Sequence, residues 1–335
     1  MTATSVAVDV ALPARGRGAV GSRLATVLGR WVVLGGFVAM VAIFGALEPD
    51  TFLDWSTAKN ILDQAAVPVM LACGLTFVLV VGEFDLSYTA TLGFAAGLVV
   101  TLMTDSGLGV GPAVLVAILA AAVIGLAVGL LVTVGGASSF IVTLAVGSAV
   151  TGLELALTDN KTIYQGVPAG FGDLASKEIL GLHRPVWLAL LVLVGSVVLL
   201  HATRFGRHAR AVGGNRAAAY LAGVEVRRIR VVCFVLVAVL AGVCAVVLTS
   251  RAASYYPNTS GSFLLNTYAA AFLGAAAGGR IGFTVAGSAL GVLWITTLQT
   301  GLTLHNEPAW TSNFIQGLVL AAAVLIAARG RRAAA

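Results

Sequence analysis

Three acidic residues stand in or beside long apolar stretches of the chain: Glu83, Asp85 and Glu154. A carboxylate in an apolar environment is unfavourable by several kcal/mol unless it is hydrated, paired or protonated, so each is a candidate functional residue. Glu83 and Asp85 could lie at a membrane surface, or Asp85 could cap the next helix beside Ser87. Glu154 shares its apolar segment with no basic residue, so it faces either a cavity or the outer surface. A proton relay through the three acids is a further alternative.

Uncharged side chains in apolar segments could also contact a polar solute. The amides of Asn266 and Gln299 could donate and accept hydrogen bonds, although bridging two helices is the more common role of such residues. The rings of Phe140, Trp294 and Trp310 could stack on a solute, although packing and interfacial positions are more common. The candidates for lining a translocation path are Asp85, Ser87, Phe140, Glu154, Asn266 and Gln299.

The chain carries no recognisable catalytic signature. A phosphate-binding loop needs a lysine that follows glycine, but Lys59, Lys161 and Lys177 all follow other residues. Neither GxSxG nor HExxH occurs, and the three cysteines stand apart in apolar runs without a CxxC spacing. We therefore expect no enzymatic activity, no metal and no cofactor on this chain, and any ATP must bind to a separate subunit.

The composition is that of a membrane protein. Of the 335 residues 59% are apolar and only 10% are charged, and the mean hydropathy is +0.99. A soluble domain carries about a quarter charged residues, so a soluble enzyme or a nucleic-acid-binding protein is excluded despite the net charge of +6. Because helices satisfy their own backbone polar groups, they are the expected spanning elements.

Ten apolar stretches approach or reach the length needed to cross a bilayer, about 20 residues. The sequence therefore predicts an all-α polytopic membrane protein with about ten transmembrane helices. A division of these helices into two halves of five favours an inverted repeat. Three GxxxG spacings within these stretches suit close helix packing. The ten ranges are 31–47, 65–82, 86–104, 111–134, 140–158, 186–201, 231–250, 264–279, 281–303 and 311–328.

The basic residues predict the orientation. With the N-terminus inside, 15 of the 20 basic residues fall on the cytoplasmic side, as the positive-inside rule requires. Both termini are then cytoplasmic. The predicted organisation is a disordered basic tail at 1–30, a permease domain at 31–328 with a cytoplasmic loop at 201–230, and a basic C-terminus at 329–335.

The loop at 201–230 contains a short bounded helix. Gly213 and Gly214 precede Asn215, a good N-cap, and Gly223 suits the position after the helix end. A helix over 216–222 is too short to persist alone in water, so a partner must hold it. Its flat face around Ala218 and the apolar Tyr220 and Leu221 suit a groove on a cytoplasmic protein. The alternative is a basic loop that lies on anionic lipid headgroups.

Several short motifs stand out along the chain: Thr203-Arg-Phe-Gly-Arg207, Ala211-Val-Gly-Gly-Asn215, Leu221-Ala-Gly223, Gly82-Glu-Phe-Asp-Leu-Ser87, Ser139-Phe-Ile-Val-Thr-Leu144, Gly278-Gly-Arg-Ile-Gly282 and Gln316-Gly-Leu318. They resemble those of monosaccharide ABC importer permeases of the ribose, xylose and galactose type, which share a larger family with branched-chain amino acid permeases. The chain departs from the usual patterns at Glu83, Tyr88-Thr89-Ala90, Val128 and Ser138, where Gly, Val-Gly-Ser, Asn and Pro are usual.

The resemblance implies a permease subunit in a bacterial inner membrane that forms the translocation pathway and performs no chemistry on the sugar. It implies three partners besides the bilayer: a cytoplasmic ATP-binding subunit, an extracytoplasmic sugar-binding protein, and a second permease copy or paralogue. It assigns residues 213–223 to ATPase coupling and favours a packed position for Asp85 near the path. The remaining alternative is an ion-coupled secondary transporter that uses the three acids.

Overall fold

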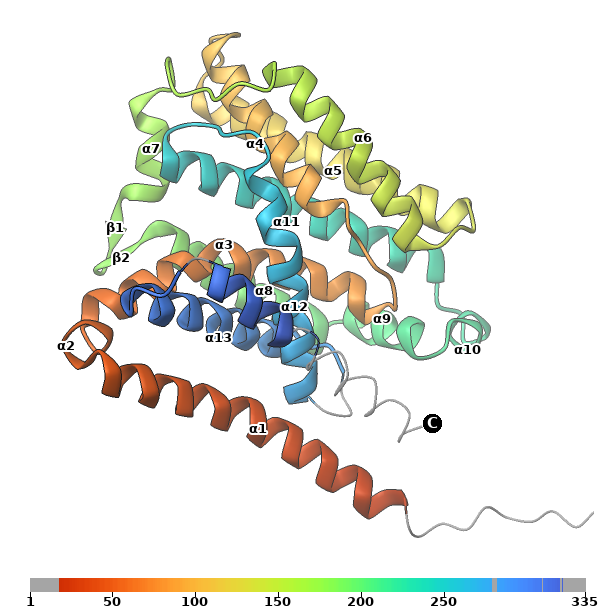
Figure 1. Cartoon of the computed structure of the whole chain (residues 1–335). Coiled ribbons are helices and arrows are strands. Elements are labelled where there is room, and N and C mark those ends of the chain that lie inside the picture. The colour runs from red at the N-terminus through yellow and green to blue at the C-terminus, as the bar shows by residue number, and fades with distance from the viewer. Residues whose placement is uncertain (1–17, 279–281, 309, 320, 322–335) are drawn as a thin grey trace, which may run out of the picture.

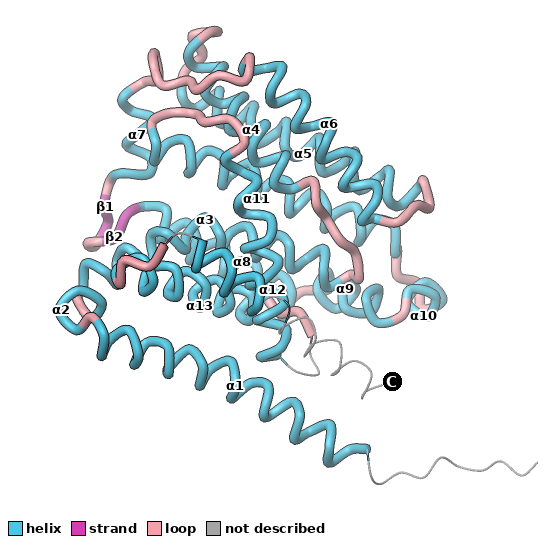
Figure 2. The backbone as a smooth tube through the Cα atoms, in the orientation of Figure 1, coloured by secondary structure: helices cyan, strands magenta, loops and turns pink. Residues whose placement is uncertain are grey.

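The computed structural model describes residues 18–278, 282–308, 310–319 and 321 (Figure 1). Apart from a small hairpin of β1 (Glu178–Ile179) and β2 (Leu182–His183), the described backbone consists of helices and connecting loops (Figure 2). The helices are α1 (Gly18–Leu47), α2 (Pro49–Phe52), α3 (Trp55–Val80), α4 (Tyr88–Thr104), α5 (Val110–Val134), α6 (Ser139–Thr158), α7 (Ala169–Ser176), α8 (Arg184–His201), α9 (Arg204–Gly214), α10 (Arg216–Leu221), α11 (Val226–Ala252), the 3-10 turn η1 (Thr259–Gly261), α12 (Ser262–Gly278) and α13 (Val285–Leu304).

The all-α membrane architecture expected from composition is confirmed. Six described helices, α3, α5, α6, α8, α11 and α13, are long and apolar enough to cross a membrane. Val33–Leu47 and α4 are shorter apolar helices, and residues 310–319 are also helical.

Two segments differ from the sequence expectation. Helix α1 begins at Gly18, inside the tail expected to be disordered over 1–30; Leu24, Val27, Leu28 and Trp31 recur there at helical spacing. The loop 201–230 holds a second helix, α9, before the predicted one. Residues 1–17 and the C-terminus expected at 329–335 lie outside the described residues.

Helix α11 is central to the packing and lies against α3, α4 and α5. Glycines make these contacts close: a Cβ on Gly125 of α5 would stand 2.5 Å from Cβ of Ala238 and 2.7 Å from the carbonyl oxygen of Phe234. Gly129 approaches Val231 one turn away, and Gly274 and Gly287 bring α12 and α13 into backbone contact. The GxxxG spacings therefore serve helix packing, where small residues let backbones approach closely.

A non-helical segment, residues 81–87, joins α3 to α4 and positions the candidate site. Helix α4 has 17 residues, so it is about 25 Å long, shorter than the roughly 30 Å hydrocarbon core of a bilayer. Figure 1 shows the segment rising from the end of α3 beside α9 to the start of α4. The segment therefore provides part of the length that a longer helix would otherwise provide.

We predict that Gly125→Ala lowers the stability of the permease by about 1–3 kcal/mol, because the added methyl overlaps α11. The matched control is Gly152→Ala on α6, since a Cβ there meets nothing within 4 Å. Alanine also favours a helix by about 1 kcal/mol, so the control should not lower stability. The measurement is the midpoint of thermal unfolding in detergent; equal midpoints for the two variants would contradict this account of the α5–α11 contact.

Candidate functional site

Alternate residues of the non-helical segment Gly82–Ser87 are buried, whereas Phe84 is 40% exposed. The side chains of Glu83, Asp85 and Ser87 belong to residues that are only 4%, 2% and 2% exposed. In hydrocarbon an unsatisfied backbone group is strongly unfavourable, so irregular backbone requires partners from neighbouring elements. The backbone N–H and C=O groups of this segment therefore need hydrogen-bond partners on neighbouring elements.

Neighbouring helices supply those partners. Tyr268 of α12 accepts a hydrogen bond through its hydroxyl from the backbone N–H of Asp85 at 3.0 Å and donates to the carbonyl oxygen of the same residue at 2.7 Å. The N–H of Phe84 donates to Ser139 Oγ at 3.1 Å, and the N–H of Leu86 donates to Thr143 Oγ1 at 3.0 Å. One short segment is thus fastened to both α6 and α12.

Asp85 bonds to the residue that precedes helix α4. Its Oδ1 accepts hydrogen bonds from the backbone N–H of Ser87 at 2.7 Å and from Ser87 Oγ at 2.6 Å. Ser87 is the N-cap residue of α4, and its own side chain makes no capping hydrogen bond to the helix. The Asp85 carboxylate therefore fixes the start of α4 through Ser87 and does not cap the helix directly.

Glu83 forms an ion pair with two arginines. Its Oε1 lies 2.5 Å from Nη2 of Arg216 and 2.5 Å from Nη2 of Arg230. The Glu83 side chain is 5% exposed, that of Arg230 14% and that of Arg216 46%. Arg216 also donates to the carbonyl oxygen of Gly82 at 3.2 Å. Glu83 is therefore a packed ion-pair partner of α10 and α11 and not a free surface acid.

The short helix predicted within the loop 201–230 is present as α10. Asn215 Oδ1 accepts from the N–H of Ala218 at 3.0 Å, and Gly223 after the helix end has φ +80°. Tyr220 and Leu221 are 72% and 85% exposed. The predicted N-cap, the C-terminal glycine and the exposed apolar pair are all confirmed.

Helix α9 lies against the end of α3. Gly213 lies so close to the carbonyl oxygen of Val80 that a Cβ would overlap it, whereas a Cβ on Gly214 would meet nothing within 4 Å. Gly213 therefore permits a close backbone contact that no larger residue would allow, and Gly214 ends α9 just before the cap. Thus α9 contacts the end of α3 through its backbone, and Arg216 of α10 contacts Gly82 and Glu83 of the segment that follows.

Glu154 faces a cavity. It is 1% exposed, and Tyr255 donates its hydroxyl to Glu154 Oε1 at 2.7 Å. Tyr255 is itself held by two backbone hydrogen bonds with Ile163, at 2.8 and 3.0 Å. The carboxylate lies over Gly93 of α4, where a Cβ would collide with Glu154 Oε2. A cavity of about 320 Å³ between α4, α6 and η1 reaches this carboxylate.

The other candidates lie elsewhere. Asn266 accepts a hydrogen bond from Gln316 Nε2, which connects α12 to the helix at 310–319, so Asn266 bridges two helices. Gln299 is half-buried in α13, and Phe140 is 50% exposed on α6. The structure does not bring Asn266, Gln299 or Phe140 into the cavity beside Glu154.

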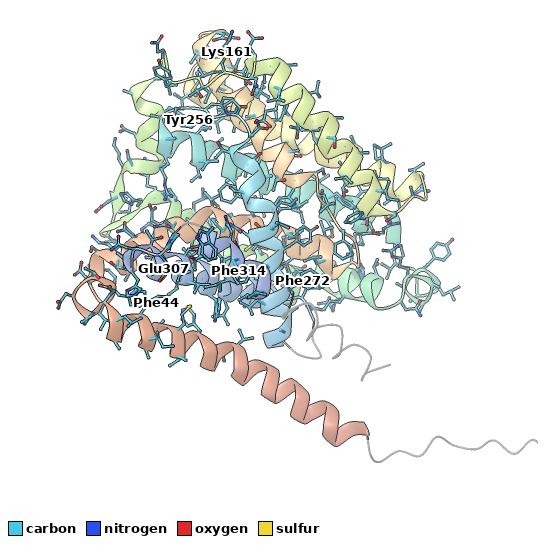
Figure 3. The ribbon with its side chains drawn as sticks, viewed as in Figure 1. Phe44, Lys161, Tyr256, Phe272, Glu307 and Phe314 are labelled. Carbon is cyan, nitrogen blue, oxygen red and sulfur yellow. The ribbon has the colours of Figure 1, made fainter. Side chains whose placement is uncertain are left out.

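Four residues that sequence reasoning did not single out belong to the site: Arg216, Arg230, Tyr255 and Tyr268. Tyr268 lies between Phe84 and Phe272 in a row of aromatic rings, with centroids 6.2 and 6.5 Å away, and Figure 3 labels Phe272 on α12. The arginines were visible only as members of a basic cluster. No local pattern marked the tyrosines, because their partners are distant in the chain.

These features define a class: a polytopic membrane protein in which two short helices, α9 and α10, contact the end of α3 and the non-helical segment that follows it. The sequence profile of the branched-chain amino acid transport system / permease component family matches residues 57–324. The chain belongs to this family.

Curated relatives match over most of their length. The ribose import permease of Bacillus subtilis (strain 168) is 35% identical over 296 residues, which cover 87% of this chain and 90% of that protein. The L-arabinose ABC transporter permease of Azospirillum brasilense is 32% identical over 328 residues, covering 96% and 93%. The ribose import permease of Escherichia coli (strain K12) is 28% identical over 298 residues, covering 86% and 90%. No solved structure gives a significant match.

We predict that Glu83→Gln destabilises the folded permease by about 3 kcal/mol, because it leaves Arg230, whose side chain is only 14% exposed, without its counter-charge. The matched control is Glu225→Gln, whose pair with Arg228 is 72–78% exposed and should contribute at most about 1 kcal/mol. Thermal unfolding of both variants in detergent measures the difference. A midpoint for Glu83→Gln as high as that of the control would show that the buried pair contributes no stability.

Proposed function

We propose that the chain is the membrane-spanning permease subunit of an ABC importer that takes up a monosaccharide. Two of the relatives are named for ribose and one for L-arabinose, and both sugars are pentoses, which supports a pentose as the solute. The observation that carries the proposal is the direct connection between α10 and the segment 82–87. A subunit moved by a separate ATPase needs such a connection.

The connection suggests how motion would pass through the subunit. ATP binding brings two ATPase subunits together, and a groove on one of them holds Tyr220 and Leu221. A displacement of α10 then acts on the segment 82–87 through Arg216 and Glu83, and through the contact of Gly213 with Val80. Since Tyr268 and Thr143 bond to the same segment, α12 and α6 receive the displacement together. The pathway opening alternates as these helices shift.

The proposal also covers the number of membrane spans, the orientation of the chain and its partners. Ten spans in a 5+5 inverted repeat place both termini and the loop 201–230 in the cytoplasm of a bacterial cell. The start of α1 lies on the same side of the molecule as α9 and α10 (Figure 1), which supports this arrangement. The complete importer contains the ATP-binding subunit, an extracytoplasmic sugar-binding protein and a second permease copy or paralogue. ATP stays on the separate subunit, and this chain needs no cofactor.

A secondary transporter driven by protons is the competing function. The geometry disfavours it, since Glu83 pairs with two arginines and the Asp85 carboxylate accepts two hydrogen bonds from Ser87. Uptake measured with a protonophore while ATP is held constant separates the two. Retained uptake agrees with the importer, and abolished uptake identifies the ion-coupled alternative.

We predict that Ala218→Glu and Gly223→Val each reduce co-purification of the ATPase, and uptake with it. Ala218 is exposed on α10, so a charge there blocks docking without disturbing insertion. Valine is strained at the φ of +80° of Gly223. The matched control is Ala169→Glu at the exposed start of α7. If both variants retain the ATPase and transport normally, α10 is not the coupling helix.

We predict that a cysteine at Tyr220 reacts with an impermeant maleimide only from the cytoplasmic side, and a cysteine at Asn160 only from outside. Lys161 and Tyr256 lie at the end of the molecule far from α10 (Figure 3). The native Cys73, Cys233 and Cys244 are buried, so background labelling of the intact permease should be low. Labelling of position 220 in intact cells would overturn the orientation.

A further inference from the structure

The cavity between α4, α6 and η1 has a polar inner end and an exposed rim. Glu154 and Thr89 are 1% and 5% exposed, whereas Leu144 at the rim is 51% exposed. Its volume of about 320 Å³ lies at the lower end of the roughly 300–1,000 Å³ range of small-molecule sites. Residues that line it are Leu86, Thr89, Ala90, Leu144, Gly147, Ser148, Thr151, Glu154, Asn258, Ser260 and Gly261.

The lining suits a neutral molecule with several hydroxyl groups. Thr89, Ser148, Thr151 and Ser260 carry hydroxyls that both donate and accept hydrogen bonds, and the Glu154 carboxylate has acceptor capacity beyond its bond with Tyr255. The apolar side chains of Leu86, Ala90 and Leu144 can contact the C–H faces of a sugar ring. Such a mixture of apolar surface with a few convergent polar groups is typical of small-molecule sites.

The charge environment does not favour a metal ion. Within the described residues, no group of three His, Cys, Asp or Glu residues is close enough to bind one. Among the ion pairs of the described residues, none involves Glu154. A single carboxylate that already accepts from a neutral tyrosine hydroxyl suits further neutral donors, which sugar hydroxyls supply.

The cavity also adjoins the non-helical segment that α10 contacts. Leu86 lines it, and Gly147 of the same lining packs on the segment so closely that a Cβ would stand 3.4 Å from Cα of Ser87. Arg216 bonds the opposite end of the segment at Gly82. A displacement of α10 would therefore change the inner wall of the cavity.

We propose that this cavity is a sugar-binding subsite of the permease itself, with Glu154 as the acceptor of sugar hydroxyls and Thr151 and Ser148 on its α6 wall. The inference rests on the proposed function and deepens it, since it places a pentose-sized site inside the subunit beside the segment that drives the transition. Release of the sugar from the cavity would then accompany movement of Leu86.

The test is calorimetric titration of the full-length permease in lipid nanodiscs with ribose and with arabinose. We expect wild type to bind at least one of the two sugars, and Glu154→Gln to bind that sugar at least about tenfold more weakly, since a hydrogen bond to a charged group contributes roughly 1.5–3 kcal/mol. Thr151→Val, which removes a hydroxyl with little change in shape, should also weaken binding. The matched control is Thr300→Val on α13, outside the cavity, which should bind as wild type does.

Two results would overturn the inference: wild type binds neither sugar, or both cavity variants bind as tightly as the Thr300→Val control. Co-purification of the ATPase is measured on the same preparations. Normal ATPase binding with no sugar binding would contradict the subsite alone, whereas loss of ATPase binding by wild type would contradict the proposed function. Thr151→Val keeps the test decisive if Glu154→Gln fails to fold.

Discussion

The architecture depends on one constraint: backbone that leaves the helix inside an apolar interior must find every hydrogen-bond partner elsewhere in the protein. Between Gly82 and Ser87 the chain meets this constraint with one tyrosine hydroxyl from α12 and two hydroxyls from α6. The helices are consequently not independent rods, because α6 and α12 are both required to satisfy the segment. The hydrogen bonds that satisfy the backbone of this segment therefore also connect it to α6 and α12.

The helices were predictable because apolar runs of membrane length have few structural alternatives. The N-cap at Asn215 and the glycine at 223 were predictable because each rests on local backbone chemistry. Helix α9 was missed although local signals were present: Thr203 caps its start, and the buried Gly206, Ala209 and Val212 recur at helical spacing. The partners of Glu83 and Glu154 could not be predicted, since Arg216 lies 133 residues from Glu83 and Tyr255 lies 101 residues from Glu154.

The ion pair of Glu83 depends on a residue that stands where Gly is usual in the motifs that the chain resembles. A glycine at position 83 offers no charge to Arg216 or Arg230. The Gly213–Val80 contact and the Asn215 cap need no carboxylate. The chain therefore connects α9 to the end of α3 by a backbone contact and adds an electrostatic connection between Glu83 and the two arginines.

The exposed Tyr220 and Leu221 have a consequence for biogenesis. Two large apolar side chains on a six-residue helix are an unfavourable surface for a subunit that waits alone in the membrane. In the proposed importer an ATPase covers them, and until it does they are available to chaperones and to quality-control proteases. The abundance of the permease should therefore follow the synthesis of its partner, so that subunit stoichiometry is set by degradation of whatever remains unassembled.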